Sequence, residues 1–477
     1  MTPKNILHFA LGPIGGALLG FISLPIVAWI FSQENVGKMA LLNVVLSFAS
    51  LFFTLGLDQC YVREFHDSRN KPLLLKTAVL PGLTLLLILL TVCLAFGPWM
   101  AEIVFSIESI FISWLLALAI LASFLSKFLS LVLRMNERGL AFSMSQLLPK
   151  AFLLIIILAY LLFDVAKTFE HLILANTFSI VCACLIFAWN TRSEWLLSLN
   201  RKIDVQQLRK MLHFGLPLIL GGIAFWGMTS LDRILLSRWS SYNELAIYSV
   251  SVSFAAAATI FQSVFSTVWA PTVYKWASKD EGHDKVIMVM RYVLILVIVL
   301  FCLAGLFSWM VPFILPVEYA AVQWILVACL AYPLFYTLSE TTVVGVGIAR
   351  KSVFAMLACI LSLSINLVCN FMIIPRYGAA GAAASTAISF WAFLILRTEF
   401  SIRVWKPLPR LLLYSFTFLC VFGAVISALE KEKLGFYLYL YWVGLLLGCG
   451  TVFRNELSRF FLKLFEKVLN LKVNPYT

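Results

Sequence analysis

Long apolar segments, separated by short polar ones, run through almost the whole chain. A helix needs roughly 20 mainly apolar residues to cross the hydrocarbon core of a bilayer, and about fourteen segments meet that length. They lie at 11–31, 39–57, 77–97, 110–133, 147–163, 171–190, 212–236, 245–270, 292–312, 321–346, 353–374, 379–400, 411–428 and 434–453. Because each segment is continuously apolar and does not alternate, the pattern predicts helices and not barrel strands. We therefore expect an all-α polytopic membrane protein with about fourteen transmembrane helices.

The composition supports this prediction, since 62% of the 477 residues are hydrophobic and only 12% are charged. Soluble domains are about 45–50% apolar and about 25% charged. A soluble fold of this length could not cover so much apolar surface. The first apolar stretch, 9–31, ends without an A-x-A-like site, so a cleavable signal peptide is not expected.

The basic residues gather in alternate loops, and this distribution predicts the orientation. Basic residues cluster after the second, fourth, sixth, eighth, tenth, twelfth and fourteenth segments: Arg63, Arg69, Lys71 and Lys76; Arg134, Arg138 and Lys150; Arg192, Arg201, Lys202, Arg209 and Lys210; Lys275, Lys279, Lys285 and Arg291; Arg350 and Lys351; Arg403, Lys406 and Arg410; Arg454, Arg459, Lys463, Lys467 and Lys472. The intervening loops at 98–109 and 313–320 have no lysine or arginine. By the positive-inside rule both termini are cytoplasmic, which requires an even number of spans.

The net charge of +13 is therefore a topology signal, and no nucleic-acid partner is expected. The same loops can contact anionic lipid headgroups. The ten cysteines lie mostly inside apolar segments, which is typical of packing rather than of metal binding or disulfides. We expect neither a metal nor a cofactor.

An internal repeat divides the chain. HFALGPIGGALLGF, from His8, matches HFGLPLILGGIAFW, from His213, and SQENVGKMALLNVVLSFAS (32–50) matches SSYNELAIYSVSVSFAA (240–256). The offset is about 205–209 residues, with six spans between the two starts, so the two copies share one orientation. We predict a six-helix bundle at 1–190, a cytoplasmic connector at 191–211, a second six-helix bundle at 212–400, and two extra helices with a basic tail at 401–477.

Three further segments carry a resemblance: TLGLDQCYVREF (54–65), SLDRILLSRW (230–239) followed by NELAIYSVSVSF (243–254), and IIPRYGAAGAAASTAIS (373–389). With them the chain resembles the multidrug/oligosaccharidyl-lipid/polysaccharide exporter superfamily, and within it polysaccharide flippases of the Wzx O-antigen type. The resemblance implies alternating-access transport of an undecaprenyl-diphosphate-linked oligosaccharide across the bacterial inner membrane. It also suggests a polysaccharide polymerase and a chain-length regulator as partners.

Charges inside the predicted spans are costly and usually face a cavity or a partner. Lys127 and Glu340 lie at similar depth in opposite copies. One interpretation makes Lys127 a contact for the anionic headgroup and Glu340 a gate or proton-linked carboxylate. The alternative is a structural ion pair, or snorkelling toward the interface.

The other candidate residues lie at the ends of spans. Arg63, beside Asp58, and Arg134 with Arg138 mark two cytoplasmic mouths, where guanidinium groups would meet an entering diphosphate or simply anchor the topology. Asp232 and Arg233 lie near the outer end of the seventh span and predict an outer gate or inter-bundle latch. Adjacent helical residues point to different sides, so we do not expect these two to pair.

Two polar features of the sequence receive structural interpretations. Asn366 and Asn370 are spaced i, i+4 and predict an interhelical hydrogen bond. In the stretch 373–389, Pro375 is expected to end one helix and Gly378 and Gly381 to permit a tight outer turn.

Alternative functions remain open at this stage. A multidrug exporter of the same superfamily is disfavoured by a first span without a carboxylate and by two helices beyond that group's usual twelve. A lipid II flippase is disfavoured by the absence of an arginine from the first span. An enzyme is not expected, because the outer loops are short and the sequence contains no nucleophile–base pair, nucleotide cradle or metal cluster.

Overall fold

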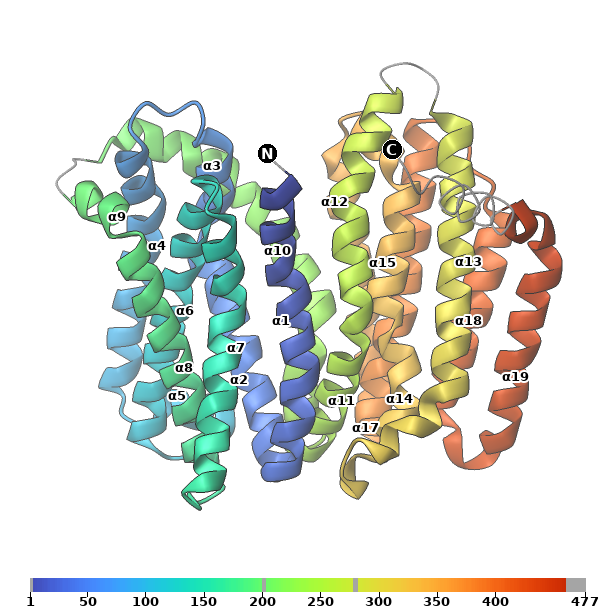
Figure 1. Ribbon diagram of the computed structural model, residues 1–477, viewed down its shortest axis with the longest axis horizontal. Helices are drawn as coiled ribbons and strands as arrows, with labels where there is room; N and C mark the ends of the chain where they lie inside the picture. Colours follow the sequence, from blue (N-terminus) through green and yellow to red (C-terminus); the bar gives the residue numbers. More distant parts are fainter. Residues whose placement is uncertain (1–2, 200–202, 278–281, 460–477) are drawn as a thin grey trace, which may run out of the picture.

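The computed structural model describes residues 3–199, 203–277 and 282–459, which form helices joined by short loops (Figure 1). The elements are α1 (Pro3–Ile30), α2 (Gln33–Phe53), α3 (Leu57–Glu64), α4 (Lys71–Ala95), α5 (Trp99–Phe105), α6 (Ile110–Met135), α7 (Gly139–Leu162), α8 (Phe169–Asn190), α9 (Arg192–Leu199), α10 (Val205–Trp239), α11 (Tyr242–Ala255), α12 (Ala257–Ala277), α13 (His283–Phe307), η1 (Ser308–Phe313), η2 (Val317–Tyr319), α14 (Val322–Cys329), α15 (Ala331–Thr342), α16 (Val344–Ile348), α17 (Ser352–Val404), α18 (Leu411–Leu429) and α19 (Lys431–Val452). The predicted all-α class is confirmed for these residues.

Short polar residues set where many of the helices begin. A side-chain oxygen accepts a hydrogen bond from a backbone N–H of the first turn, which satisfies one of the donors that a helix start leaves free. The residues that do so are Ser32, Asn70, Ser109, Thr168, Asp204 and Ser241. These caps divide one long apolar sequence into separate helices.

The helix named α17 is two antiparallel helices joined at Gly378. This glycine has φ 51° and ψ −124°, a conformation that L-residues with a side chain avoid. The side-chain amide of Asn366 donates to Ser389 Oγ at 3.3 Å, which is possible only if the chain folds back between them. The predicted turn is confirmed, although the first helix continues past Pro375 and the reversal occurs at Gly378.

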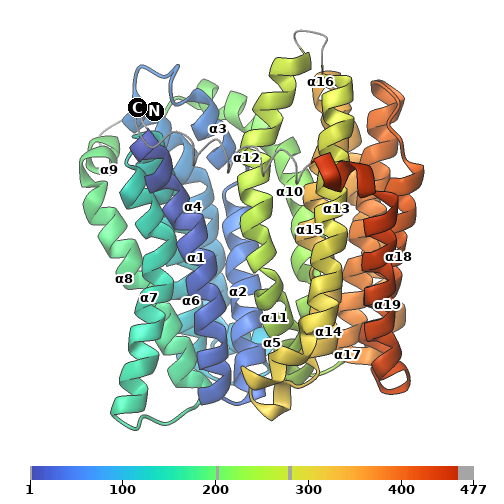
Figure 2. The same cartoon turned by 45° about the vertical axis from the view of Figure 1, so that its right-hand side comes forward.

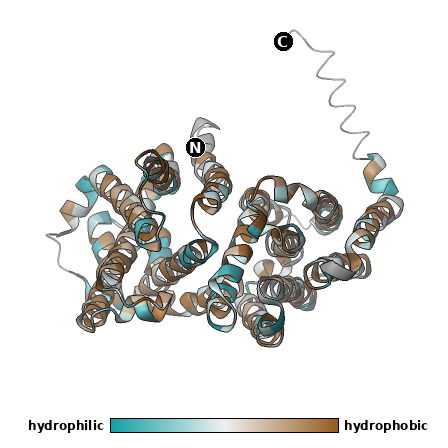
Figure 3. Cartoon of the chain, turned by 90° about the horizontal axis from the view of Figure 1, so that it is seen from below, coloured by the Kyte–Doolittle hydropathy of each residue, from teal (hydrophilic) through white to brown (hydrophobic). Residues whose placement is uncertain are grey.

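Within the described residues, eleven helices are long and apolar enough to span a membrane, or twelve if α11 and α12, bent by 47°, form one span. Starting from twelve, counting α17 as two spans adds one, and the shorter apolar helix Ile14–Ile30 of α1 adds another. The total is the fourteen that the sequence predicts. The molecule is thus a multi-pass membrane protein. Seen along the helices, much of the helical ribbon has the colour of hydrophobic residues (Figure 3).

The helices form two groups side by side, as Figures 1 and 2 show. In the first, α1 packs against α7, and α6 against α2 and α8. In the second, α17 packs against α10, α14 and α15, while α18 and α19 cover α14 and α13. The groups meet where α2 packs against α10 and α11, and where α1 packs against α12.

The two ends of the helix bundle contain different short helices and loops. The basic end, at the top of Figure 1, contains α3, α9 and the loops 65–70, 136–138, 349–351 and 405–410. The far end contains α5, η1, η2 and the loops 31–32, 163–168 and 240–241. The predicted basic residues at 201–202, at 279 and after 459 lie outside the described residues.

One predicted boundary is wrong by eight residues, with a consequence for charge. The sequence pattern predicts a fifth span that begins at 147, with Lys150 grouped among the basic residues of the preceding loop although it lies three residues inside that span, whereas α7 begins at Gly139. Polar residues in its first turns, among them Ser143 and Gln146, resemble a loop in sequence but pack against α1. Lys150 is therefore inside the helix.

Candidate functional site

Lys127 and Asp58 come together near the basic end of the first helix group. Lys127 lies eight residues before the end of α6, about 12 Å along the helix axis. Its Nζ is 4.0 Å from Asp58 Oδ2 at the start of α3; the Lys127 side chain is 46% exposed and that of Asp58 11%. A pair this long and this exposed contributes about 0–1 kcal/mol. The ammonium can therefore exchange its partner for another anion.

The three predicted arginine contacts have different surroundings. The guanidinium of Arg63 lies 4.3 Å from the centre of the Phe214 ring, on α10. Arg134 is exposed in the last turn of α6. Arg138 donates to Asn190 O and to Glu194 Oε1, both at 2.8 Å. Arg138 thus fixes α9 to the end of α8, while Arg63 and Arg134 are also exposed at this end.

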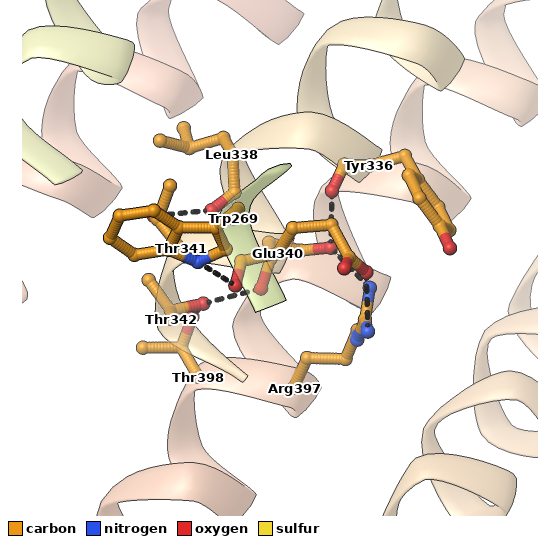
Figure 4. A network of polar contacts seen from close by, with 9 residues as sticks. Trp269, Tyr336, Leu338, Glu340, Thr341, Thr342, Arg397 and Thr398 are labelled. Atoms are coloured by element: carbon orange, nitrogen blue, oxygen red, sulfur yellow. Dashed lines mark hydrogen bonds and ion pairs between the residues drawn. The ribbon is translucent and has the colours of Figure 1, made fainter. Parts of the chain in front are cut away.

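Glu340 forms a tight ion pair, one of the alternatives that the sequence left open, with a partner that the sequence analysis did not name. Arg397, from the second half of α17, points toward Glu340 (Figure 4) and donates to its Oε1 at 2.8 Å. It also donates to Ser339 Oγ at 2.7 Å. The Glu340 side chain is only 15% exposed and that of Arg397 only 11%. Arg397 also lies 5.4 Å and 5.0 Å from the ring centres of Tyr336 and Phe393. Like Glu340, Arg397 is a charged residue inside a predicted span, 379–400, so the same criterion applies to it.

A cavity of about 460 Å³ adjoins this pair toward the basic end. Its polar and aromatic lining includes Trp269, Tyr274, Glu340, Arg350, Ser352 and Arg397. Trp269 donates its indole N–H to the backbone carbonyl of Glu340 at 3.0 Å, which fixes α12 to α15. At Gly347 a side chain would collide with the Tyr274 hydroxyl, so this glycine is needed for close packing.

Asp232 is fully buried and accepts three hydrogen bonds. The donors are Tyr248 Oη at 2.8 Å, Asn370 Nδ2 at 2.6 Å and Thr386 Oγ1. A second bond from Asn370 reaches Asn366 Oδ1 at 2.9 Å. The predicted interhelical bonds of the two asparagines are confirmed. These partners come from α10, α11 and both halves of α17, so the network holds one helix group together and does not connect the two groups.

Arg233 is oriented away from its neighbour Asp232, as helical geometry predicts. Its guanidinium donates to Thr229 O at 3.2 Å and lies 5.8 Å from the centre of the Tyr248 ring. Both residues are about 10 Å before the end of α10, on the far side of the membrane core from the basic loops.

Other residues close the far end between the helix groups. Trp29 Nε1 donates to Ile314 O at 2.9 Å, and Gln33 Nε2 donates to Glu318 O at 2.7 Å. From the second group, Arg238 donates to Ile103 O and Tyr242 Oη to Val104 O at 3.4 Å. Every acceptor is a backbone carbonyl, a group that every residue has and that a sequence therefore cannot identify as a contact. The charges of Asp232 and Arg233 are visible in the sequence, so those two residues were predicted as the gate instead.

The fold and family can be compared with known proteins. A family model described as polysaccharide biosynthesis protein matches residues 3–277. A search of curated proteins found no match. Among solved structures, the lipid II flippase MurJ in an inward closed conformation is similar, with TM-score 0.68 and 13% identity over 94% of this chain and 99% of that one.

Two MATE transporters also have this fold. One is from Vibrio cholerae, with TM-score 0.58 and 14% identity over 84% of this chain and 96% of the other. The second, a multidrug resistance transporter of the MOP superfamily in an inward-facing conformation, has TM-score 0.57 and 13% identity over 81% and 94%. The fold is shared with these solved transporters, and the chain belongs to the polysaccharide biosynthesis protein family.

Proposed function

We propose that this protein is a flippase for undecaprenyl-diphosphate-linked oligosaccharides, such as O-antigen-like repeat units, in the bacterial inner membrane. The basic end would be cytoplasmic, together with both termini, because basic loops are retained there. Membership of the polysaccharide biosynthesis family supports the saccharide class of the substrate. A polysaccharide polymerase and a chain-length regulator would act on the product.

Alternating access would operate between segments 1–190 and 212–400, with 191–211 as connector and 401–477 carrying the two extra helices. Four hydrogen bonds link the helix groups at the far end. A substrate would therefore enter from the basic end and leave after these bonds break. In this scheme Asp232 and Arg233 support the outer gate from within the second bundle, and Glu340 positions Arg397.

The observation that carries the proposal is the loose Lys127–Asp58 pair at the basic end. A diphosphate presents strong acceptors and two or more negative charges, so it would displace a carboxylate 4.0 Å away. Arg63, Arg134 and Arg138 would provide further positive potential along the same end. Asp58 would then act as the partner that holds Lys127 when the site is empty.

Complementation of a deletion strain tests this function. Replacing Lys127 or Arg63 with Ala should remove most surface polysaccharide while the protein remains at wild-type abundance in the membrane. The matched control is Arg192→Ala, because Arg192 lies 4.5 Å from the Trp189 ring much as Arg63 lies on Phe214, but in α9. Wild-type polymer in both variants would overturn the substrate assignment.

A lipid II flippase is the second candidate, supported by the similarity of the whole chain to MurJ. Both substrates are polyprenyl-diphosphate-linked saccharides, so the same cations would serve either. Rescue of a strain depleted of its lipid II flippase would favour this candidate. Restoration of surface polymer without such rescue would favour the first, and drug export by the deletion strain carrying the chain would favour a multidrug exporter over both.

A further inference from the structure

Lys150 is a cation in the middle of the first helix group to which the proposed site assigns no role. It lies eleven residues after the start of α7, about 16 Å along a helix of 24 residues. At this depth an ionisable side chain is costly and normally faces a cavity or a partner. The one hydrogen-bond partner that Lys150 has among the described residues is therefore informative.

That partner is the backbone of α1. Lys150 Nζ donates to the carbonyl oxygen of Gly16 at 2.5 Å. Gly20, one turn further along α1, leaves room for the ammonium, since a Cβ there would be 3.1 Å from Nζ. Nearer the basic end, Gly12 N donates to Ser143 Oγ at 2.9 Å. Side chains of α7 thus hold α1 through its main chain.

The charge of Lys150 is not neutralised within the described part of the chain. Lys127 has Asp58, and Arg397 has Glu340, at ion-pair distance. For Lys150, no described carboxylate lies within 4.0 Å. A carbonyl dipole satisfies one of the three ammonium donors but supplies no counter-charge. An anion that reaches this position would bind to an ammonium already present.

We propose that Lys150 is a second anion contact for the diphosphate of the lipid-linked substrate, and that the diphosphate competes with the Gly16 carbonyl for its ammonium. This inference rests on the proposed function. A phosphate oxygen forms a stronger, charge-assisted bond than a carbonyl. Binding of the diphosphate therefore removes one polar contact between α7 and α1 and loosens their packing, so occupancy of the site is coupled to the position of a helix that also contacts α12 in the other group.

Binding of undecaprenyl diphosphate to the purified full-length chain in nanodiscs of zwitterionic lipid tests the first half of the proposal. Lys150→Met keeps an unbranched side chain one atom shorter and removes the charge. We expect it to weaken binding at least tenfold for the diphosphate and to leave binding of the uncharged undecaprenol unchanged. The matched control is Lys76→Met, because Lys76 also donates to a carbonyl, that of Leu199, but at the end of α9.

Three outcomes contradict the proposal. Equal diphosphate affinity of Lys150→Met and the wild type overturns the role of Lys150 alone. An equal loss of diphosphate affinity in Lys76→Met would show a non-specific effect of charge and would also overturn the role of Lys150. If the wild type binds undecaprenol and the diphosphate equally, the proposed function fails with it.

A disulfide tests the loosening of α1 from α7 without relying on the folding of Lys150→Met. A Cβ on Gly12 would lie 3.2 Å from Ser143 Cβ and 2.9 Å from Ser143 Cα, so Gly12→Cys with Ser143→Cys can be bridged once the two helix backbones move apart by a few tenths of an ångström. Oxidation should tether α1 to α7 and weaken diphosphate binding severalfold, and reduction of the same sample should restore it. Binding that oxidation leaves unchanged would overturn the coupling.

Discussion

The two helix groups place opposite charges at corresponding positions. Glu340 follows Lys127 by 213 residues, and Arg350 follows Glu137 by the same interval. Both Glu137 and Arg350 have positive φ, 56° and 55°, and end a helix with the same pair of backbone hydrogen bonds. One backbone design therefore carries a cation in the first group where it carries an anion in the second.

The partners of these charges differ more than the backbone does. Lys127 is half exposed and 4.0 Å from its carboxylate, whereas Glu340 is nearly buried and 2.8 Å from its guanidinium. Water weakens the first pair, and burial makes the second one costly to break. The first pair suits a site that exchanges ligands, and the second suits a fixed contact between α15 and α17.

The largest expected effect comes from breaking the fixed pair. Arg397→Ala leaves Glu340 buried without its partner and should lower stability by about 3–5 kcal/mol, measured by thermal unfolding in detergent. The double replacement Glu340→Leu with Arg397→Met removes both charges and should recover most of that loss. A loss below about 1 kcal/mol for Arg397→Ala would mean that the pair is as loose as the one in the first group.

A smaller effect is expected at the two helix ends. Glu137→Gly and Arg350→Gly should each stabilise the protein by about 1 kcal/mol, because glycine adopts positive φ without the steric cost that a side chain incurs. The unfolding temperature of each variant measures this. If only one of the two is stabilised, the corresponding helix ends are not equivalent in energy.

The smallest effect on stability is expected where the effect on transport is largest. Lys127→Met should change stability by less than about 1 kcal/mol, since the pair with Asp58 is long and exposed. The same variant should lose export of surface polysaccharide. A loss of stability equal to that of Arg397→Ala would show that Lys127 is a structural residue and would remove the contrast between the groups.

The sequence predicted the helices more successfully than their contacts. Continuous apolar segments identify spans because lipid solvates every one of them in the same way. The start of α7 was misplaced because its polar residues face α1 and not lipid, which composition cannot distinguish from a loop. Lys150 was grouped with the basic loop residues because of its charge, although it lies inside both the predicted span and α7.

The candidate site was predicted in part, because a sequence shows which residues are charged but not which residue each of them pairs with. Lys127 and Asp58 were both singled out for separate roles, but their proximity depends on how α3 folds back against α6. Asp232 was singled out by its charge, while the hydroxyl and amide groups around it come from distant helices. Arg397 could have been found, since it is an arginine within a predicted span.

The hydrogen bonds at the far end have a consequence for sequence divergence. Their acceptors are the main-chain carbonyls of Ile103, Val104, Ile314 and Glu318, which every amino acid supplies. Substitutions at these four positions can accumulate without loss of the contact, and only the donors Trp29, Gln33, Arg238 and Tyr242 are constrained. Homologous chains with unrelated loops at this end can therefore retain the same closed arrangement.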